Sequence, residues 1–217
     1  AEGDAINSDL IRITKRNLDS LGIFKSVKID ETYLNDNLLD IDIYVEEKST
    51  GEFQIGLSFG TLEGATFISG LKEKNIAGLG REINLAINTS ADNTKYNFGI
   101  VEPYVFNNRL SLIFGMDYEE NDFSDSASYN LNSFTTNAGF RYSLVEDLFH
   151  AITLEYRLKE YKITNSSDVS SDIEKLSGNN ADILLNNNFI YNKLNSNLRP
   201  TKGSLVEYAN VLSPVTN

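Results

Sequence analysis

The sequence predicts a mainly β chain: the first part of a transmembrane antiparallel β-barrel of about nine strands, preceded by a helix–strand–strand unit. Two observations predict this fold. From residue 51 onwards, apolar and polar residues alternate with a period of two in one segment after another. Before residue 51, one segment carries the helical period instead. A barrel wall in a membrane requires such alternation, because one face meets lipid and the other faces an aqueous interior.

A helix is predicted over residues 7–22. Asn7 or Ser8 can serve as its N-cap, and Gly22 stands where a left-handed C-cap residue is common. No other segment combines both end signals with a helical period. The apolar residues at helical spacing are Leu10, Ile13, Leu18 and Leu21.

Two strands are predicted after the helix, over Phe24–Asp30 and Leu38–Glu46, with turn residues at positions 35–37. Helix and strands together form a small α+β unit. We therefore expect residues 1–48 to be one domain and residues 49–217 to be the barrel strands.

The segment Glu52–Gly60 alternates most strictly. Phe53, Ile55, Leu57 and Phe59 occupy one face, whereas Gln54, Gly56, Ser58 and Gly60 leave the other face with little volume. Such a strand suits a wall with lipid outside and water inside. Further alternating segments occur at 65–71, 83–88, 96–101, 110–118, 134–144, 152–159, 183–191 and 206–212.

The connections alternate between short and long. Residues 107–108 and 145–147 are short turns, whereas 119–130 and 164–180 are long, polar and acidic, and are expected to be solvated extracellular loops. Tyrosines near the predicted strand ends fit an interfacial girdle. They are Tyr96, Tyr104, Tyr118, Tyr142, Tyr156, Tyr161 and Tyr191.

Charged residues on one face of the predicted strands point to a wet lumen. Glu155, Arg157 and Lys159 alternate with apolar residues, and Lys72 and Arg141 are assigned to the same lumen-facing surface. A soluble sandwich with a solvated outer sheet face would carry the same pattern in a single strand. The long series of such segments, with no helix to cover a sheet, favours a barrel.

Composition excludes several classes of function. The chain has no cysteine and one histidine, His150, which is expected to be a partly wet strand residue, so neither a metal site nor a cofactor is predicted. The net charge of −12 argues against nucleic acid as a partner. No run of apolar residues is long enough for a transmembrane helix, and no catalytic motif predicts an enzyme.

Several short motifs keep an order and spacing that extend over essentially the whole chain. They are Leu18-xx-Leu21-Gly22-x-Phe24-xx-Val27, Val45-Glu46-Glu47, Gly56-x-Ser58-Phe59-Gly60-Thr61, Glu102-Pro103-Tyr104, Tyr191-Asn192-Lys193-Leu194, Pro200-Thr201 and Gly203-Ser204. This series resembles the BamA family of outer-membrane β-barrel assembly factors, which join POTRA domains to a barrel of roughly sixteen strands.

The resemblance implies that residues 1–48 are the C-terminal portion of the last POTRA domain, in the periplasm, and that residues 49–217 are the first strands of an incomplete barrel in the bacterial outer membrane. It implies a role in folding and inserting β-barrel proteins. Client strands would pair with Glu52–Gly60 at the lateral gate. The implied partners are outer-membrane lipids, unfolded β-barrel clients and accessory periplasmic lipoproteins of the BAM complex.

Alternatives remain at each level. Gly56 and Gly60 either make the gate strand flexible or simply ease barrel curvature. The edge of Leu38–Val45 either receives clients or is an ordinary sheet edge. A related two-partner-type secretion pore, a passive porin and a soluble β-rich adhesin are the competing functions.

Overall fold

The computed structural model describes residues 6–35, 38–61, 64–105, 110–195 and 200–216 of the 217-residue chain. The chain divides into two compact units, and each is considered by itself. The first comprises the residues up to Thr50 together with the short segment 195–201, and the second comprises the remainder.

Helix α1 (Ser8–Ser20) opens the first unit. Asn7 is its N-cap, because the Asn7 Oδ1 atom accepts hydrogen bonds from the backbone N–H groups of Asp9 and Leu10. Gly22 follows the C-cap with φ +70°, the left-handed conformation that favours glycine. The predicted helix is therefore confirmed, with slightly tighter bounds. No helix in the described ranges is long and apolar enough to cross a membrane.

Strands β1 (Phe24–Asn35) and β2 (Leu38–Glu47) form an antiparallel pair in the first unit. Helix α1 packs against β1, and Lys15 Nζ donates to the carbonyl oxygen of Val27 at 2.6 Å. Val27 is 5% exposed and lies opposite Val45. Strand β1 extends further than predicted and reaches Asn35; the rest of the predicted turn lies outside the described residues.

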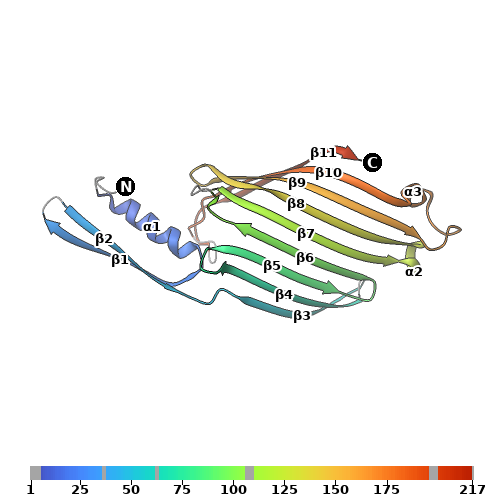
Figure 1. Ribbon diagram of the computed structural model, residues 1–217, viewed down its shortest axis with the longest axis horizontal. Coiled ribbons are helices and arrows are strands. Elements are labelled where there is room, and N and C mark those ends of the chain that lie inside the picture. Colours follow the sequence, from blue (N-terminus) through green and yellow to red (C-terminus); the bar gives the residue numbers. More distant parts are fainter. Residues whose placement is uncertain (1–5, 36–37, 62–63, 106–109, 196–199, 217) are drawn as a thin grey trace. The chain divides into compact units, whose positions relative to one another are not determined.

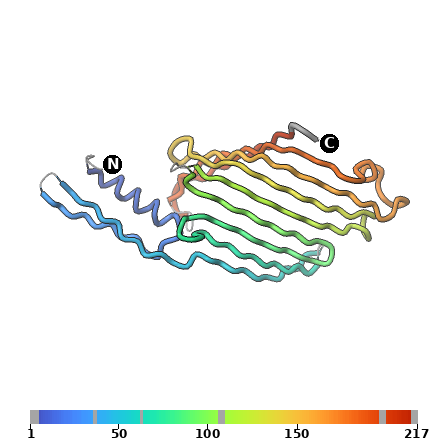
Figure 2. Tube along the Cα trace, viewed as in Figure 1, coloured from blue at the N-terminus to red at the C-terminus, as the bar shows by residue number. Residues whose placement is uncertain are grey.

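The second unit contains a nine-stranded antiparallel sheet in which each strand pairs with its neighbours in sequence, from β3 at one edge to β11 at the other (Figures 1 and 2). The predicted fold class is confirmed by this continuous meander. Its strands are β3 (Glu52–Gly60), β4 (Gly64–Ile76), β5 (Arg81–Thr89), β6 (Asn93–Glu102), β7 (Leu110–Phe123), β8 (Tyr129–Val145), β9 (Leu148–Ile163), β10 (Gly178–Asn192) and β11 (Leu205–Thr216).

The register assigns every strand residue to one of two faces, because directly paired residues of antiparallel strands share a face. One face carries a row that runs from Phe53 through Leu85 and Phe98 to Tyr156, and we call it the apolar face. The opposite face carries Asn97 and is called the polar face.

The turn between β4 and β5 illustrates how local chemistry ends these strands. Ala77, Gly78 and Gly80 all have positive φ, at 56°, 74° and 67°. The side chain of Asn75 holds this turn closed, since its Oδ1 accepts a hydrogen bond from the backbone N–H of Gly80 at 2.7 Å. The chain therefore reverses direction between β4 and β5 without a long loop.

The prediction of a long loop over residues 119–130 is wrong. Strand β7 continues to Phe123, the four-residue helix α2 (Ser124–Ala127) makes the turn, and β8 begins at Tyr129. The acidic residues Glu119 and Glu120 are therefore strand residues. The connection from β9 to β10 is long, as predicted, and contains helix α3 (Ser171–Lys175). The predicted turn at 107–108 lies outside the described residues.

Candidate functional site

Strand β3 is one edge of the sheet, and within the described residues it pairs only with β4. Its register places Phe53 opposite Leu71, and Phe59 opposite Ala65. Phe53 and Phe59 are 68% and 80% exposed, so this row is not part of a packed protein interior. All nine residues predicted as the client-pairing segment belong to this strand.

Gly56 lies in the middle of β3, where space does not require a glycine. A Cβ atom added at Gly56 would lie 3.9 Å from the Cβ of Ile68, which is ordinary van der Waals contact. Gly139 differs, because a Cβ there would lie 2.0 Å from the carbonyl oxygen of Ile152. Gly56 therefore has no steric cause within its own strand pair, whereas Gly139 is needed for close approach of two backbones.

The five residues predicted to line the lumen share the polar face. Lys72 on β4 is connected to Glu155 on β9 by an unbroken register row through β5, β6, β7 and β8. Arg157 and Lys159 alternate with Glu155 along β9, and Arg141 on β8 pairs with Ala151 of the same face. They do not form a single cluster, since they are distributed over the width of the sheet.

Two ion pairs involve these residues. Lys72 Nζ lies 2.7 Å from Glu82 Oε1, and Arg157 Nη2 lies 2.5 Å from Glu155 Oε1. Asn186 Nδ2 on β10 donates to the other carboxylate oxygen of Glu155 at 3.0 Å. Charged side chains on the polar face can therefore be stabilised by ion pairs and hydrogen bonds with their neighbours.

Sequence reasoning missed a ladder of amides and carboxylates on the polar face. Asn84 Nδ2 donates to Asn97 Oδ1 at 2.7 Å, and Asn97 Nδ2 donates to Asp117 Oδ1 at 2.8 Å. These bonds connect β5, β6 and β7. Alternating asparagines were visible in the sequence, but their pairing depends on the strand register, which periodicity alone does not give.

His150 lies on the apolar face and is only 9% exposed, so the prediction of a partly wet residue is wrong. Its ring stacks on Phe189 at a centroid distance of 4.2 Å and an interplanar angle of 9°. Its Nδ1 atom lies 2.8 Å from the Tyr142 hydroxyl. Both neighbours are its direct register partners on the adjacent strands, and they cover the imidazole from both sides.

The predicted tyrosine girdle is divided between two faces. Tyr96, Tyr118, Tyr142, Tyr156 and Tyr191 lie on the apolar face. Tyr161 lies on the polar face, where its ring is 6.0 Å from that of Tyr129. Tyr104 follows the end of β6 with φ 57°.

We call the part of the apolar face that is covered by apolar side chains the apolar belt. The long strands β7 to β10 extend beyond this belt at their ends near α2 and α3. On the apolar face, the row formed by Tyr118, Phe134 and Leu158 is followed by a row of polar residues. Beyond this boundary the polarity of the two faces inverts, because an aromatic cluster occupies the other face. The polar residues are Glu120, Asn132, Glu160 and Asn179, and the cluster is Phe123, Tyr129 and Tyr161.

An open antiparallel meander with one exposed apolar face and one polar face is the arrangement of an outer-membrane β-barrel wall. The model of the Omp85 superfamily domain matches residues 75–215. The chain therefore belongs to the Omp85 superfamily.

Curated relatives carry outer-membrane assembly names. BamA of Buchnera aphidicola is 30% identical over 146 residues, covering 64% of this chain and 24% of the relative. BamA of Nitratidesulfovibrio vulgaris is 24% identical over 214 residues, covering 97% of this chain and 26% of the relative. The chain thus spans about a quarter of the length of these relatives.

Solved structures confirm the fold. BamA from Haemophilus ducreyi lacking POTRA domains 1–3 superposes with a TM-score of 0.73 at 22% identity, over 100% of this chain and 44% of that one. CdiB from Acinetobacter baumannii superposes with a TM-score of 0.58 at 14% identity, over 100% of this chain and 42% of that one. These findings confirm the resemblance predicted from the sequence and the location in the bacterial outer membrane.

Proposed function

We propose that this chain contributes the first barrel strands of an outer-membrane assembly factor that folds and inserts β-barrel proteins. The observation that carries the proposal is the edge position of β3, whose second side has no partner strand among the described residues. The names of the curated relatives support assembly as the function. No covalent chemistry is required.

The proposed mechanism is strand templating. A sheet edge presents N–H and C=O groups that an incoming extended strand can satisfy. In hydrocarbon this pairing is strongly favoured, because an unsatisfied backbone group there costs several kcal/mol. Strand β3 has nine residues and is about 30 Å long, which is enough to cross the apolar band at the usual tilt.

Release of the client requires that pairing at β3 is weaker than pairing within the sheet. Gly56 lowers the intrinsic strand preference of β3 and has no steric reason to be a glycine. Strand β3 is also shorter than β7 to β10, which have 14 to 17 residues. We therefore assign the lateral gate to Glu52–Gly60.

The polar face is assigned to the lumen. Lys72, Glu155 and Arg157 hold partners on that face, and the amide ladder through Asn97 adds polar groups between them. A water-filled interior stabilises such groups, whereas hydrocarbon does not. The charges thus fix the orientation of the wall and have no transport role in this proposal.

The first unit is proposed to be the end of a POTRA domain in the periplasm. Its helix–strand–strand order and the pairing of β1 with β2 support this assignment. The outer edge of β2 could bind an unfolded client or an accessory lipoprotein by strand addition. An ordinary sheet edge remains the alternative.

A crosslinking experiment tests the gate. Cysteine is introduced at Gln54 or Ser58 of the full-length protein, and a stalled β-barrel client with cysteines along its last strand is added. We expect disulfide-linked client at these positions. The control position is Thr135 on β8, which lies on the same polar face as Gln54 and Ser58 and has partner strands on both sides. Absence of client adducts throughout β3 would overturn the gate assignment.

The secretion-pore alternative has less support, since the curated relatives carry the names of assembly factors. The same experiment separates the two functions. A secreted chain passing through the lumen would crosslink to polar-face positions across the sheet, including both Asn97 and Gln54, because these two share a register row. A client paired at the gate would crosslink to Gln54 and Ser58 and not to Asn97.

A further inference from the structure

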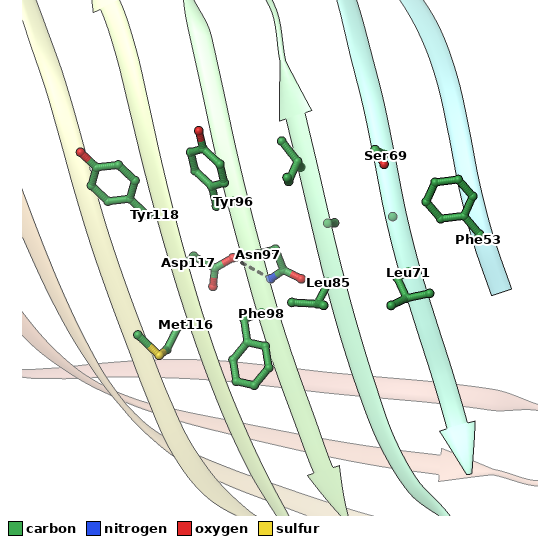
Figure 3. Close-up of a pocket in the computed structure, with 13 residues that line it drawn as sticks. Phe53, Ser69, Leu71, Leu85, Tyr96, Asn97, Phe98, Met116, Asp117 and Tyr118 are labelled. Carbon is green, nitrogen blue, oxygen red and sulfur yellow. Dashed lines mark hydrogen bonds between the residues drawn. The ribbon is translucent and has the colours of Figure 1, made fainter. Parts of the chain in front are cut away.

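A hollow of about 410 Å³ lies on the sheet over strands β3 to β7 (Figure 3). All of the side chains that form its walls belong to the apolar face. One wall is the register row that contains Leu85, Phe98 and Met116, and the other is the next row, which contains Ser69, Ile87 and Tyr96. The hollow is therefore a furrow between two rows of side chains, running across the strands.

The backbone forms the floor of the furrow. Gly70, Ala86, Asn97 and Asp117 also line it. Their register places all four on the polar face, so we infer that they contribute through their main chains. Successive rows on one face are two residues apart, about 6.6 Å along the strand. From β3 to β7 the furrow crosses four strand spacings, which makes it about 19 Å long.

Ser69 is the residue whose small side chain widens the furrow. It stands in a row of large side chains, between Ile55 on β3 and Ile87 on β5. Its short side chain lowers that wall at β4. At the β7 end, the same wall is raised by the stacked rings of Tyr96 and Tyr118, whose centroids are 6.3 Å apart.

The position of the furrow relative to the polar boundary identifies its occupant. The Tyr118 hydroxyl donates to Glu120 Oε1 at 2.9 Å, and Glu120 is the first polar residue of β7 beyond the apolar belt. The furrow therefore begins beside the level of the lipid head groups and continues within the apolar belt. Its volume falls in the range of small ligand pockets, about 300–1,000 Å³.

We propose that the furrow binds one acyl chain of an outer-membrane lipid, more tightly than the rest of the apolar face does. Continuity with the membrane-facing surface favours a lipid over a soluble ligand, and a predominantly apolar lining disfavours water. The inference rests on the proposed orientation, in which the apolar face meets lipid. It assigns to this face a specific lipid site that includes β3, the proposed gate strand.

The test uses the full-length protein in phosphatidylethanolamine vesicles that contain a tracer phospholipid with a diazirine in the middle of one acyl chain. After irradiation, mass spectrometry maps the lipid adducts. We expect adducts on Leu85 and Phe98 to exceed those on Phe140 and Leu154, which lie on the same face outside the furrow.

A larger side chain that fills the furrow should remove the excess of lipid adducts on Leu85 and Phe98. Ser69→Phe should lower adduct yield on Leu85 and Phe98 about tenfold, the effect of losing contact with roughly two methylenes. Ala138→Phe is the matched control, because Ala138 lies on the same face away from the furrow. Leu85→Phe fills the furrow from the opposite wall, with Phe98 as its readout, and serves if Ser69→Phe does not fold.

The outcomes distinguish the two proposals. Even labelling of Leu85, Phe98, Phe140 and Leu154 would overturn the lipid site and leave the membrane orientation intact. Absence of labelling on all four would overturn the orientation itself. If furrow residues are still labelled in excess in both Ser69→Phe and Leu85→Phe, the lipid site is also contradicted.

Discussion

Asn186 and Glu155 are joined across strands β10 and β9, with Asn186 Nδ2 donating to Glu155 Oε2 at 3.0 Å. The residue before Glu155 has the opposite surroundings. Leu154 lies on the apolar face between Ala138 and Leu185, its register partners on the two adjacent strands. One step along β9 thus separates a hydrogen-bonded carboxylate from an exposed apolar side chain.

A charge at Leu154 should therefore cost far more than a charge beside it. Leu154→Arg should lower the free energy of unfolding by about 2–4 kcal/mol, because the new charge enters the middle of the apolar band. Thr153→Lys, on the polar face, should cost less. Urea unfolding of the full-length protein in lipid vesicles measures both. Equal losses for the two variants would contradict the assignment of the faces.

The amide ladder on the polar face should contribute measurably to stability. Asn97→Ala removes the acceptor for Asn84 and the donor for Asp117, so we expect a loss of about 1–2 kcal/mol in the free energy of unfolding. The exposed Asn179 provides a matched control, and Asn179→Ala should change stability by no more than about 0.5 kcal/mol. Unfolding in urea, followed by tyrosine fluorescence, gives both values. If Asn97→Ala matches the control, the ladder is not structural.

The two glycines Gly139 and Gly56 should respond differently to alanine. Gly139→Ala places a methyl group against the backbone of β9, and the strands must separate, at a cost of about 1–3 kcal/mol. Gly56→Ala meets only ordinary contact, so stability should stay the same or rise by up to about 1 kcal/mol. Thermal unfolding of the two variants provides the comparison.

Gly56→Ala also tests why β3 has a glycine at its centre. If flexibility of the gate matters, the variant should assemble client barrels more slowly while remaining fully folded. Assembly of a reporter barrel into vesicles measures this rate. An unchanged rate would favour the simpler explanation, that Gly56 eases curvature.

His150 should act mainly as a stacked ring. His150→Ala should lower stability by about 1–2 kcal/mol, through loss of the contact with Phe189 and of buried area. His150→Phe should cost less than half as much, because it keeps a ring in place and removes the buried Nε2 atom, which has no hydrogen-bond partner. Equal losses for alanine and phenylalanine would show that the Tyr142 contact matters more than the stack.

The sequence predicts the strands of this sheet well where the apolar residues of a strand stay on the same face along its length. The segments from Glu52 to Tyr118 and from Phe134 to Leu158 follow that rule, since most of their large apolar side chains are on one face. Ile68, Ile113 and Phe149 are exceptions on the other face. Prediction fails at residues 119–130. There the polarity of the faces inverts, and acidic residues beside Phe123 and Tyr129 give a strand the composition of a loop.

Contacts between strands are less accessible to sequence reasoning than the strands themselves. The burial of His150 depends on Tyr142 and Phe189 being its register partners, and the amide ladder depends on Asn97 lying between Asn84 and Asp117. Both require the register of three strands, and a period of two leaves that register open. The furrow at Ser69 likewise becomes visible only when the rows of five strands are aligned.

The orientation of the two sheet faces is tested most directly by the accessibility of neighbouring side chains on β9. Nitroxide labels are attached one at a time at Leu154 and Glu155 of the full-length protein in vesicles, and their collision rates with oxygen and with a water-soluble nickel complex are measured. If the apolar face meets lipid and the polar face meets water, position 154 should collide mainly with oxygen, which concentrates in lipid, and position 155 mainly with the nickel complex. Collision with nickel at both positions, or protection of position 154 from both reagents, would contradict this orientation.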